Sequence, residues 1–166
     1  MILPFSTNIN GKETFFVQKI WGSLKSKCNL KDFIDETPTK FFASFEVSKN
    51  LKPKLHTIRE DKNDRWKIGT LIHFYINARQ KNMFRFAPVL PVVSIQKIEI
   101  KMIGFSDGFR PWVKIDDKLF YDVAEKLKPQ MLQFAQNDGF DTIEDFFNYF
   151  DKDYLGKIIH WTDLKY

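Results

Sequence analysis

Three side chains that could do chemistry together lie within one short segment of the sequence, at Lys54, Thr57 and Arg59. A threonine hydroxyl is a weak nucleophile alone, but a neighbouring amine can accept its proton, and an arginine can hold an anion. The same three groups could equally bind a phosphate or the edge of a nucleobase. The segment therefore predicts either a catalytic site or a binding site.

Strands must position this segment, because β-type patterns dominate from residue 54 onward. We expect strands at 55–59 and 70–76, followed by a long β-stretch at 84–103. The apolar residues of that stretch change phase midway, which predicts a β-bulge near Gln96. Such a bulge bends a strand, as the closure of a small barrel requires.

Helical patterns flank the expected strands. We predict helices from residue 18 to about 27, from about 122 to 137, and from a cap at Asp141 or Thr142 to about 149, with Pro129 breaking the second or starting a new one. Residues 1–13 are interpreted as a loose arm. The predicted fold class is α+β, a small mixed β-barrel with peripheral helices.

The composition is typical of a soluble globular protein. Hydrophobic residues make up 43% of the chain and charged residues 28%, which excludes a disordered chain. The one cysteine, Cys28, excludes an intramolecular disulfide, and no secretion signal or membrane-spanning run is evident. We therefore expect a cytoplasmic protein whose residues 1–166 form a single domain, with an insertion at about 21–53.

Charge is unevenly distributed along the chain. The net charge is +5, and residues 49–85 carry ten Lys/Arg against three acids, a balance of +7. Residues 137–166 carry seven acids against three lysines, a balance of −4. Such a distribution fits a nucleic-acid groove beside an acidic wall, or simply two solvated faces of opposite sign.

A second candidate feature is Trp66, which stands between Arg65 and Lys67, with Arg79 further along the same basic stretch. Aromatic residues alternating with basic ones are typical of proteins that stack on single-stranded nucleic acid. The alternative is that Trp66 packs in the core and the charges form a solvated rim.

Neither a metal ion nor a cofactor is expected. The three histidines lack metal-ligand spacing and have no second cysteine to support them. The sequence also contains no glycine-rich phosphate-binding loop.

The order of these motifs resembles the ASCH domain family of the PUA-like superfamily. The resemblance covers most of residues 14–20 and 54–161, and it is carried by Lys54-x-x-Thr57-Ile58-Arg59, Trp66-x-x-Gly69, Asn137-Asp138-Gly139-Phe140 and Ile158-Ile159-His160-Trp161. It implies a PUA-like β-barrel with a cleft that binds RNA or a modified nucleoside.

Some members of that family are similar in motif and hydrolyse the amide of an N4-acylated cytidine with a lysine, a threonine and a glutamate. By position, the resemblance places these catalytic roles on Lys54, Thr57 and Asp138. Thr57 would attack, Lys54 would take its proton, and Asp138 would position that proton. The expected ligand-binding residues are Arg59, Trp66, His56, Arg65, Lys67 and Arg79.

Two features of the sequence leave this site open. On a regular strand Lys54 would face away from Thr57, so the chain must turn at Pro53, or the long side chain must curl over the barrel end. Asn-Asp-Gly is also a common exit from a helix, which gives Asp138 a purely structural explanation.

Three hypotheses follow from the sequence. The first is an ASCH-type domain that binds RNA or a nucleoside-like ligand in a cleft at the barrel mouth. The second is an amidohydrolase that acts on an acylated pyrimidine nucleoside. The third is a protein-interaction module that contacts an unknown protein partner through residues 28–53.

Overall fold

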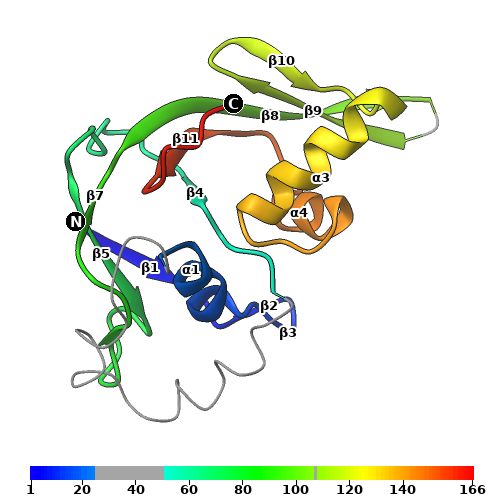
Figure 1. Ribbon diagram of the computed structural model, residues 1–166. Coiled ribbons are helices and arrows are strands. Elements are labelled where there is room, and N and C mark those ends of the chain that lie inside the picture. The colour runs from blue at the N-terminus through cyan, green and yellow to red at the C-terminus, as the bar shows by residue number, and fades with distance from the viewer. Residues whose placement is uncertain (25–50, 107) are drawn as a thin grey trace.

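The computed structural model describes residues 1–24, 51–106 and 108–166 as a mixed α+β arrangement (Figure 1). Most of the expected insertion, including Cys28, lies outside these residues. The predicted α+β class is confirmed. In the described part of the chain, no helix has both the length and the apolar character needed to cross a membrane.

The first sheet contains four strands, which are β1 (Ile2–Phe5), β5 (Leu71–Ile76), β6 (Phe84–Arg85) and β7 (Leu90–Pro91). β1 pairs in parallel with β5, so the prediction of a loose N-terminal arm is wrong. Leu3 and Phe5 are buried while their neighbours are exposed, which is the alternation of a half-buried strand. Four residues are too few for that alternation to stand out in the sequence.

The second sheet is antiparallel and has five strands in the order β10-β9-β8-β11-β4. These strands are β4 (His56–Arg59), β8 (Ser94–Phe105), β9 (Gly108–Ile115), β10 (Lys118–Tyr121) and β11 (Tyr154–His160). β4 lies at one edge of this sheet and pairs only with β11 among the described strands.

The predicted β-bulge near Gln96 is wrong. β8 pairs with β11 in one unbroken register from Ser94 to Ile100. The apolar phase changes because β8 packs on both of its faces: Ile98 belongs to one hydrophobic cluster, and Ile95 packs against the other.

Local signals predicted the helical elements well. A 3₁₀ turn (Glu125–Leu127) precedes α3 (Lys128–Asn137), and Pro129 lies in the first turn of α3. The hydroxyl of Thr142 caps α4 (Ile143–Tyr149) by accepting the backbone N–H of Asp145 at 3.0 Å. The remaining described elements are α1 (Phe16–Leu24) and a short hairpin of β2 (Asn8–Ile9) and β3 (Lys12–Glu13).

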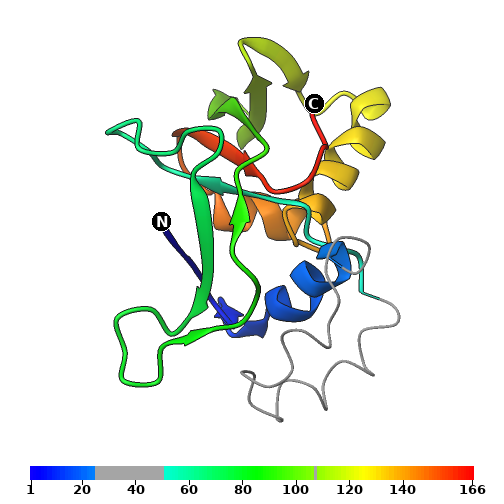
Figure 2. The ribbon, with the colours of Figure 1, turned by 60° about the vertical axis from the view of Figure 1, so that its left-hand side comes forward.

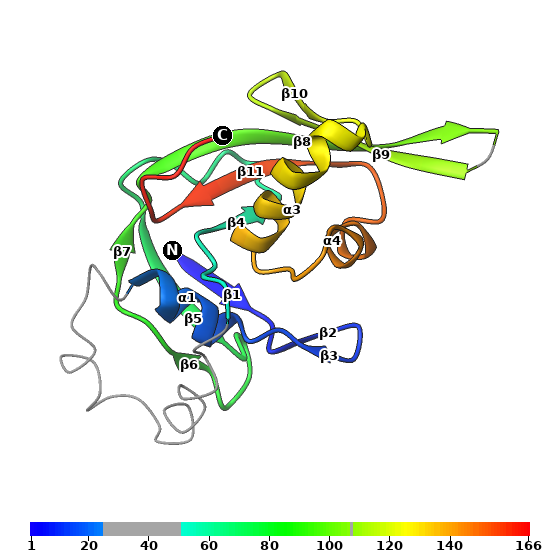
Figure 3. The same ribbon diagram turned by 45° about the vertical axis from the view of Figure 1, so that its right-hand side comes forward.

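Two hydrophobic clusters hold these layers together. α1 covers the first sheet, with Ile20 and Trp21 packed against Phe74 and its neighbours (Figure 2). α3 and α4 cover one face of the second sheet, where Phe134 and Phe146 meet the strand residues (Figure 3).

The expected closed barrel is not found among the described residues. β1 and β4 are edge strands of different sheets, and no backbone ladder joins them. A side chain joins them instead, because the guanidinium of Arg59 donates to the carbonyl oxygen of Pro4 at 2.8 Å. The opening that this leaves between the two sheet edges is the place of the candidate site.

Candidate functional site

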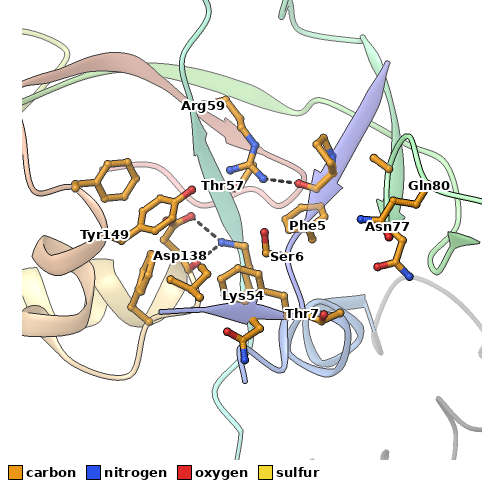
Figure 4. Close-up of a pocket in the computed structure, with 17 residues that line it drawn as sticks. Phe5, Ser6, Thr7, Lys54, Thr57, Arg59, Asn77, Gln80, Asp138 and Tyr149 are labelled. Carbon is orange, nitrogen blue, oxygen red and sulfur yellow. Dashed lines mark hydrogen bonds and ion pairs between the residues drawn. The ribbon is translucent and has the colours of Figure 1, made fainter. Parts of the chain in front are cut away.

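A cavity of about 530 Å³ lies between the end of β1 and one face of β4 (Figure 4). Residues from β1, the following turn, β4, the end of α3 and the end of α4 line it. Its charged lining residues, within the described chain, are Lys54, Arg59 and Asp138. The cavity therefore brings Asp138 together with two residues of the 54–59 segment, about 80 positions earlier in the sequence.

Lys54 is not part of a strand, which removes the geometric objection raised by strand alternation. It precedes β4, and its backbone N–H donates to the carbonyl oxygen of Lys19 at 3.0 Å. The next amide, that of Leu55, donates to the carbonyl oxygen of Asn137 at 2.7 Å. These two bonds fix the segment between α1 and the end of α3, so the lysine side chain enters the cavity wall instead of facing solvent.

The amine of Lys54 forms a buried ion pair with Asp138. The distance between Lys54 Nζ and Asp138 Oδ1 is 2.8 Å, and Nζ also donates to the backbone carbonyl of Asp138. Both side chains are at least 95% buried. Figure 4 shows the two groups pointing toward each other at one end of the cavity.

Burial shifts the pKa of each partner in the direction that favours the neutral form of that side chain. Desolvation lowers the pKa of Lys54 to about 8, although the charge of Asp138 opposes the shift. Desolvation likewise raises the pKa of Asp138, while the charge of Lys54 opposes this. An amine with such a pKa is partly neutral slightly above pH 7 and could accept a proton.

The sequence Asn137-Asp138-Gly139 both ends α3 and supplies the carboxylate of the candidate site. Asp138 is the C-cap of α3, and Gly139 follows with φ of +94°. A Cβ on Gly139 would lie 2.7 Å from the ring of Phe16 and 3.0 Å from Cδ of Lys54. Glycine therefore supplies the left-handed turn and also leaves the space through which the lysine reaches the carboxylate.

Thr57 lies on the face of β4 that lines the cavity, together with Arg59. His56 and Ile58 point to the other face, as strand alternation requires. No hydrogen bond joins Lys54 Nζ to Thr57 Oγ, both of which the structure describes. The structure thus places the threonine and the lysine in one cavity without connecting them directly.

Arg59 carries the cavity's uncompensated charge. Its guanidinium donates to the carbonyl oxygens of Ile58 and Pro4 at 2.9 and 2.8 Å, and it lies 5.3 Å from the ring centroid of Phe5. Within the described chain it forms no ion pair with a carboxylate. Because Lys54 and Asp138 neutralise each other, the lining carries one net positive charge.

His56 is fully buried behind the ion pair. Its Nε2 lies 2.8 Å from the hydroxyl of Tyr166, which also accepts a hydrogen bond from Asn137 Nδ2 at 2.9 Å. Its Nδ1 lies 3.6 Å from Asp138 Oδ1, an electrostatic contact longer than a hydrogen bond. A proton on Nδ1 is favoured, since it faces the carboxylate and leaves Nε2 to accept from the tyrosine.

Several residues predicted for the site lie elsewhere. Trp66 is buried in the first hydrophobic cluster and cannot stack on a base, so the core interpretation holds for it. Arg65 and Lys67 project from the loop beside it, toward Asp61 and Asp64 respectively. Arg79 is absent from the cavity lining, although neighbours on both sides line it.

Sequence reasoning missed the aromatic and amide parts of the site. Five rings line the cavity, those of Phe5, Phe16, Phe140, Tyr149 and Phe150. Side-chain amides and hydroxyls complete it, from Ser6, Thr7, Asn8, Asn77 and Gln80. These residues come from segments far apart in the sequence, so no local pattern indicates that they share one cavity.

The histidines are not arranged as metal ligands. His56 and His160 are neighbours across β4 and β11, with ring centroids 5.3 Å apart. Across residues 1–24, 51–106 and 108–166, no three His, Cys, Asp or Glu side chains are grouped so that they could hold a metal ion.

Comparisons of the chain with models of known protein families, with curated proteins and with solved structures found no match. The interpretation of the site therefore rests on its own geometry and on the motifs of the sequence.

The environment of His56 predicts a neutral imidazole with its proton on Nδ1. Burial lowers the pKa of His56 well below 6.5, and His160 and Lys54 lower it further. The unfolded chain therefore binds a proton below pH 6.5 that the folded chain does not, and stability falls on acidification. As the pH falls below 6.5, wild type should therefore lose more stability than His56→Gln, measured by urea unfolding.

The tautomer can be measured separately by ¹⁵N NMR of the imidazole. We expect His56 to show a protonated Nδ1 and to titrate well below pH 6.5. A His56 that titrates near pH 6.5, or that carries its proton on Nε2, contradicts this description of the site.

Proposed function

We propose that this protein is an ASCH-type domain whose cavity binds a nucleoside or nucleotide, either free or as an exposed base of RNA. The observation that carries the proposal is the convergence of aromatic rings, side-chain amides and one uncompensated arginine on a single cavity between β1 and β4. The motif resemblance from residue 54 to residue 161 supports the same ligand class.

The size and rings of the cavity fit one base and its sugar. A volume of about 530 Å³ falls in the usual range for small-molecule sites, which is roughly 300–1,000 Å³. Phe140 and Tyr149 lie at one end of the cavity with ring centroids 5.4 Å apart. A nucleobase stacks favourably on such rings, typically by about 1–3 kcal/mol.

The polar lining fits the edges of that ligand. Asn77 and Gln80 lie across the cavity from Asp138 and Tyr149 (Figure 4). Their amides can donate and accept at once, which suits the mixed donor and acceptor edge of a pyrimidine. Arg59 adds a positive charge between these walls, and its remaining N–H groups can bind a phosphate.

Arg59 should determine the affinity for a charged ligand. We expect cytidine monophosphate to bind more tightly than cytidine, measured by quenching of intrinsic fluorescence. Arg59→Ala should weaken binding of the monophosphate about 10-fold, because a charge-assisted hydrogen bond contributes about 1.5–3 kcal/mol. Arg59→Lys keeps the charge and should retain part of the preference.

Arg65→Ala is the matched control, since Arg65 is 66% exposed and lies outside the cavity. It should bind the monophosphate as wild type does. Equal weakening by Arg59→Ala and Arg65→Ala would attribute binding to overall charge and would contradict the proposed cavity. Failure of wild type to bind any cytidine or uridine compound would overturn the proposal itself.

Hydrolysis of an acylated cytidine is the second candidate function. The observation that favours it is a buried lysine with a lowered pKa in the same cavity as a strand threonine. In this reaction Thr57 Oγ would bond to the acyl carbonyl carbon and pass its proton to the neutral Lys54 amine. The C–N bond would then break, the leaving nitrogen would take that proton, and water would release the acyl group from Thr57.

The geometry sets one condition for this chemistry. The Lys54 amine donates to Asp138, so it would have to turn toward Thr57 when ligand binds. Catalytic hydrogen bonds are often long before substrate is present and shorten in the complex.

Release of cytidine from N4-acetylcytidine tests this second function. We expect wild type to release it, Thr57→Val to release it at least about 100-fold more slowly, and Thr57→Ser to retain activity. Thr57→Val keeps the side-chain shape and removes only the hydroxyl. Equal release by wild type and Thr57→Val, or none from either, would rule out hydrolysis of this substrate and leave the binding proposal standing.

A further inference from the structure

The strands β8 and β9 continue beyond the rest of the second sheet as a two-stranded ribbon (Figure 3). β11 pairs with β8 only as far as Ile100, and β10 pairs with β9 only as far as Val113. The ladder from Lys101 to Phe105 therefore has no further strand beside it in the described chain. At about 3.3 Å per residue, this segment is roughly 17 Å long.

One face of this ribbon alternates apolar and basic side chains. Partners directly opposite in an antiparallel ladder share a face, so Lys101 lies beside Trp112 and Ile103 beside Arg110. We call this surface the ribbon face. It consists of Lys101, Ile103, Phe105, Arg110 and Trp112, with the opposed pair Glu99 and Lys114 at its inner end.

Cations and rings are already paired on the ribbon face. The guanidinium carbon of Arg110 lies 4.6 Å from the ring centroid of Phe105. The amine of Lys114 lies 4.6 Å from the ring centroid of Trp112. These contacts hold each positive charge beside a flat apolar surface, within the distance of a cation–π interaction.

Burial in the core does not explain these apolar side chains. On the ribbon face, Ile103 is 40% exposed and Phe105 is 50% exposed. Phe109 points to the opposite face of the ribbon. Its ring lies over Gly104, where an added Cβ would be 3.5 Å from the ring. Exposed apolar side chains on a projecting ribbon indicate an interaction surface more than a structural one.

Charge distinguishes among the partners that could cover this surface. The ribbon face carries three cations, and Glu99, at its inner end, pairs with Lys101 at 2.9 Å. These described side chains together keep a net positive charge. An apolar protein surface offers no negative charge to them. A single-stranded nucleic acid offers a base to each ring and a phosphate to each cation.

We propose that the ribbon face is a binding surface for single-stranded nucleic acid. The bases stack on Phe105 and Trp112, and the phosphates contact Arg110, Lys114 and Lys101. None of these residues lines the cavity between β1 and β4. The inference is therefore independent of the ligand proposed for that cavity.

Fluorescence anisotropy with a short labelled oligouridine tests this proposal. We expect wild type to bind at low salt and Phe105→Ala/Trp112→Ala to bind about 10-fold or more weakly, because stacking on an aromatic ring contributes about 1–3 kcal/mol per base. Arg110→Gln/Lys114→Gln should reduce the slope of log affinity against log salt by about 1.4, which is about 0.7 for each phosphate that is no longer neutralised. Thermal unfolding of each variant should match wild type, because the ribbon projects from the core.

Matched controls come from exposed residues elsewhere. Ile68→Ala removes an exposed apolar side chain and Lys62→Gln an exposed cation, and neither should change oligouridine binding. The proposal is overturned if the ribbon variants bind oligouridine as tightly as wild type does, or if wild type does not bind it. It is also overturned if polyglutamate competes equally well, because that would show attraction by charge alone.

Discussion

The buried ion pair between Lys54 and Asp138 is the interaction on which the rest of the site depends. It joins the segment before β4 to the end of α3, and so links the two layers on either side of the cavity. Moving two charges out of water costs several kcal/mol for each ion, and the shifted pKa of each partner shows that their attraction does not fully offset this cost. A pair of this kind beside a cavity is more readily explained by function than by stability.

The opening between β1 and β4 lies beside this ion pair. Arg59 bridges the two strand edges through its side chain, and no backbone ladder joins them in the described part of the chain. The open edge instead leaves a strand face, two cations and one carboxylate around a space lined by phenylalanines.

Local signals made part of this arrangement predictable from the sequence. The Pro129 helix start, the Thr142 cap, the strand at residue 56 and the Asp138-Gly139 exit each depend on a few neighbouring residues. The convergence of Lys54 and Asp138 came from the motif resemblance. Sequence reasoning could not find the β1–β5 pairing or the aromatic lining, because these depend on long-range packing. Trp66 shows the same limit, since its basic neighbours indicated a nucleic-acid contact and tertiary packing buried it.

A double-mutant cycle on the free energy of unfolding tests the role of the ion pair most directly. Lys54→Met and Asp138→Leu each leave one buried charge without its partner, which should cost about 3–5 kcal/mol by urea denaturation. The double variant removes both charges, so it should be less destabilised than the sum of the single variants and close to wild type. Losses that simply add would show that the two groups do not depend on each other and would contradict the account.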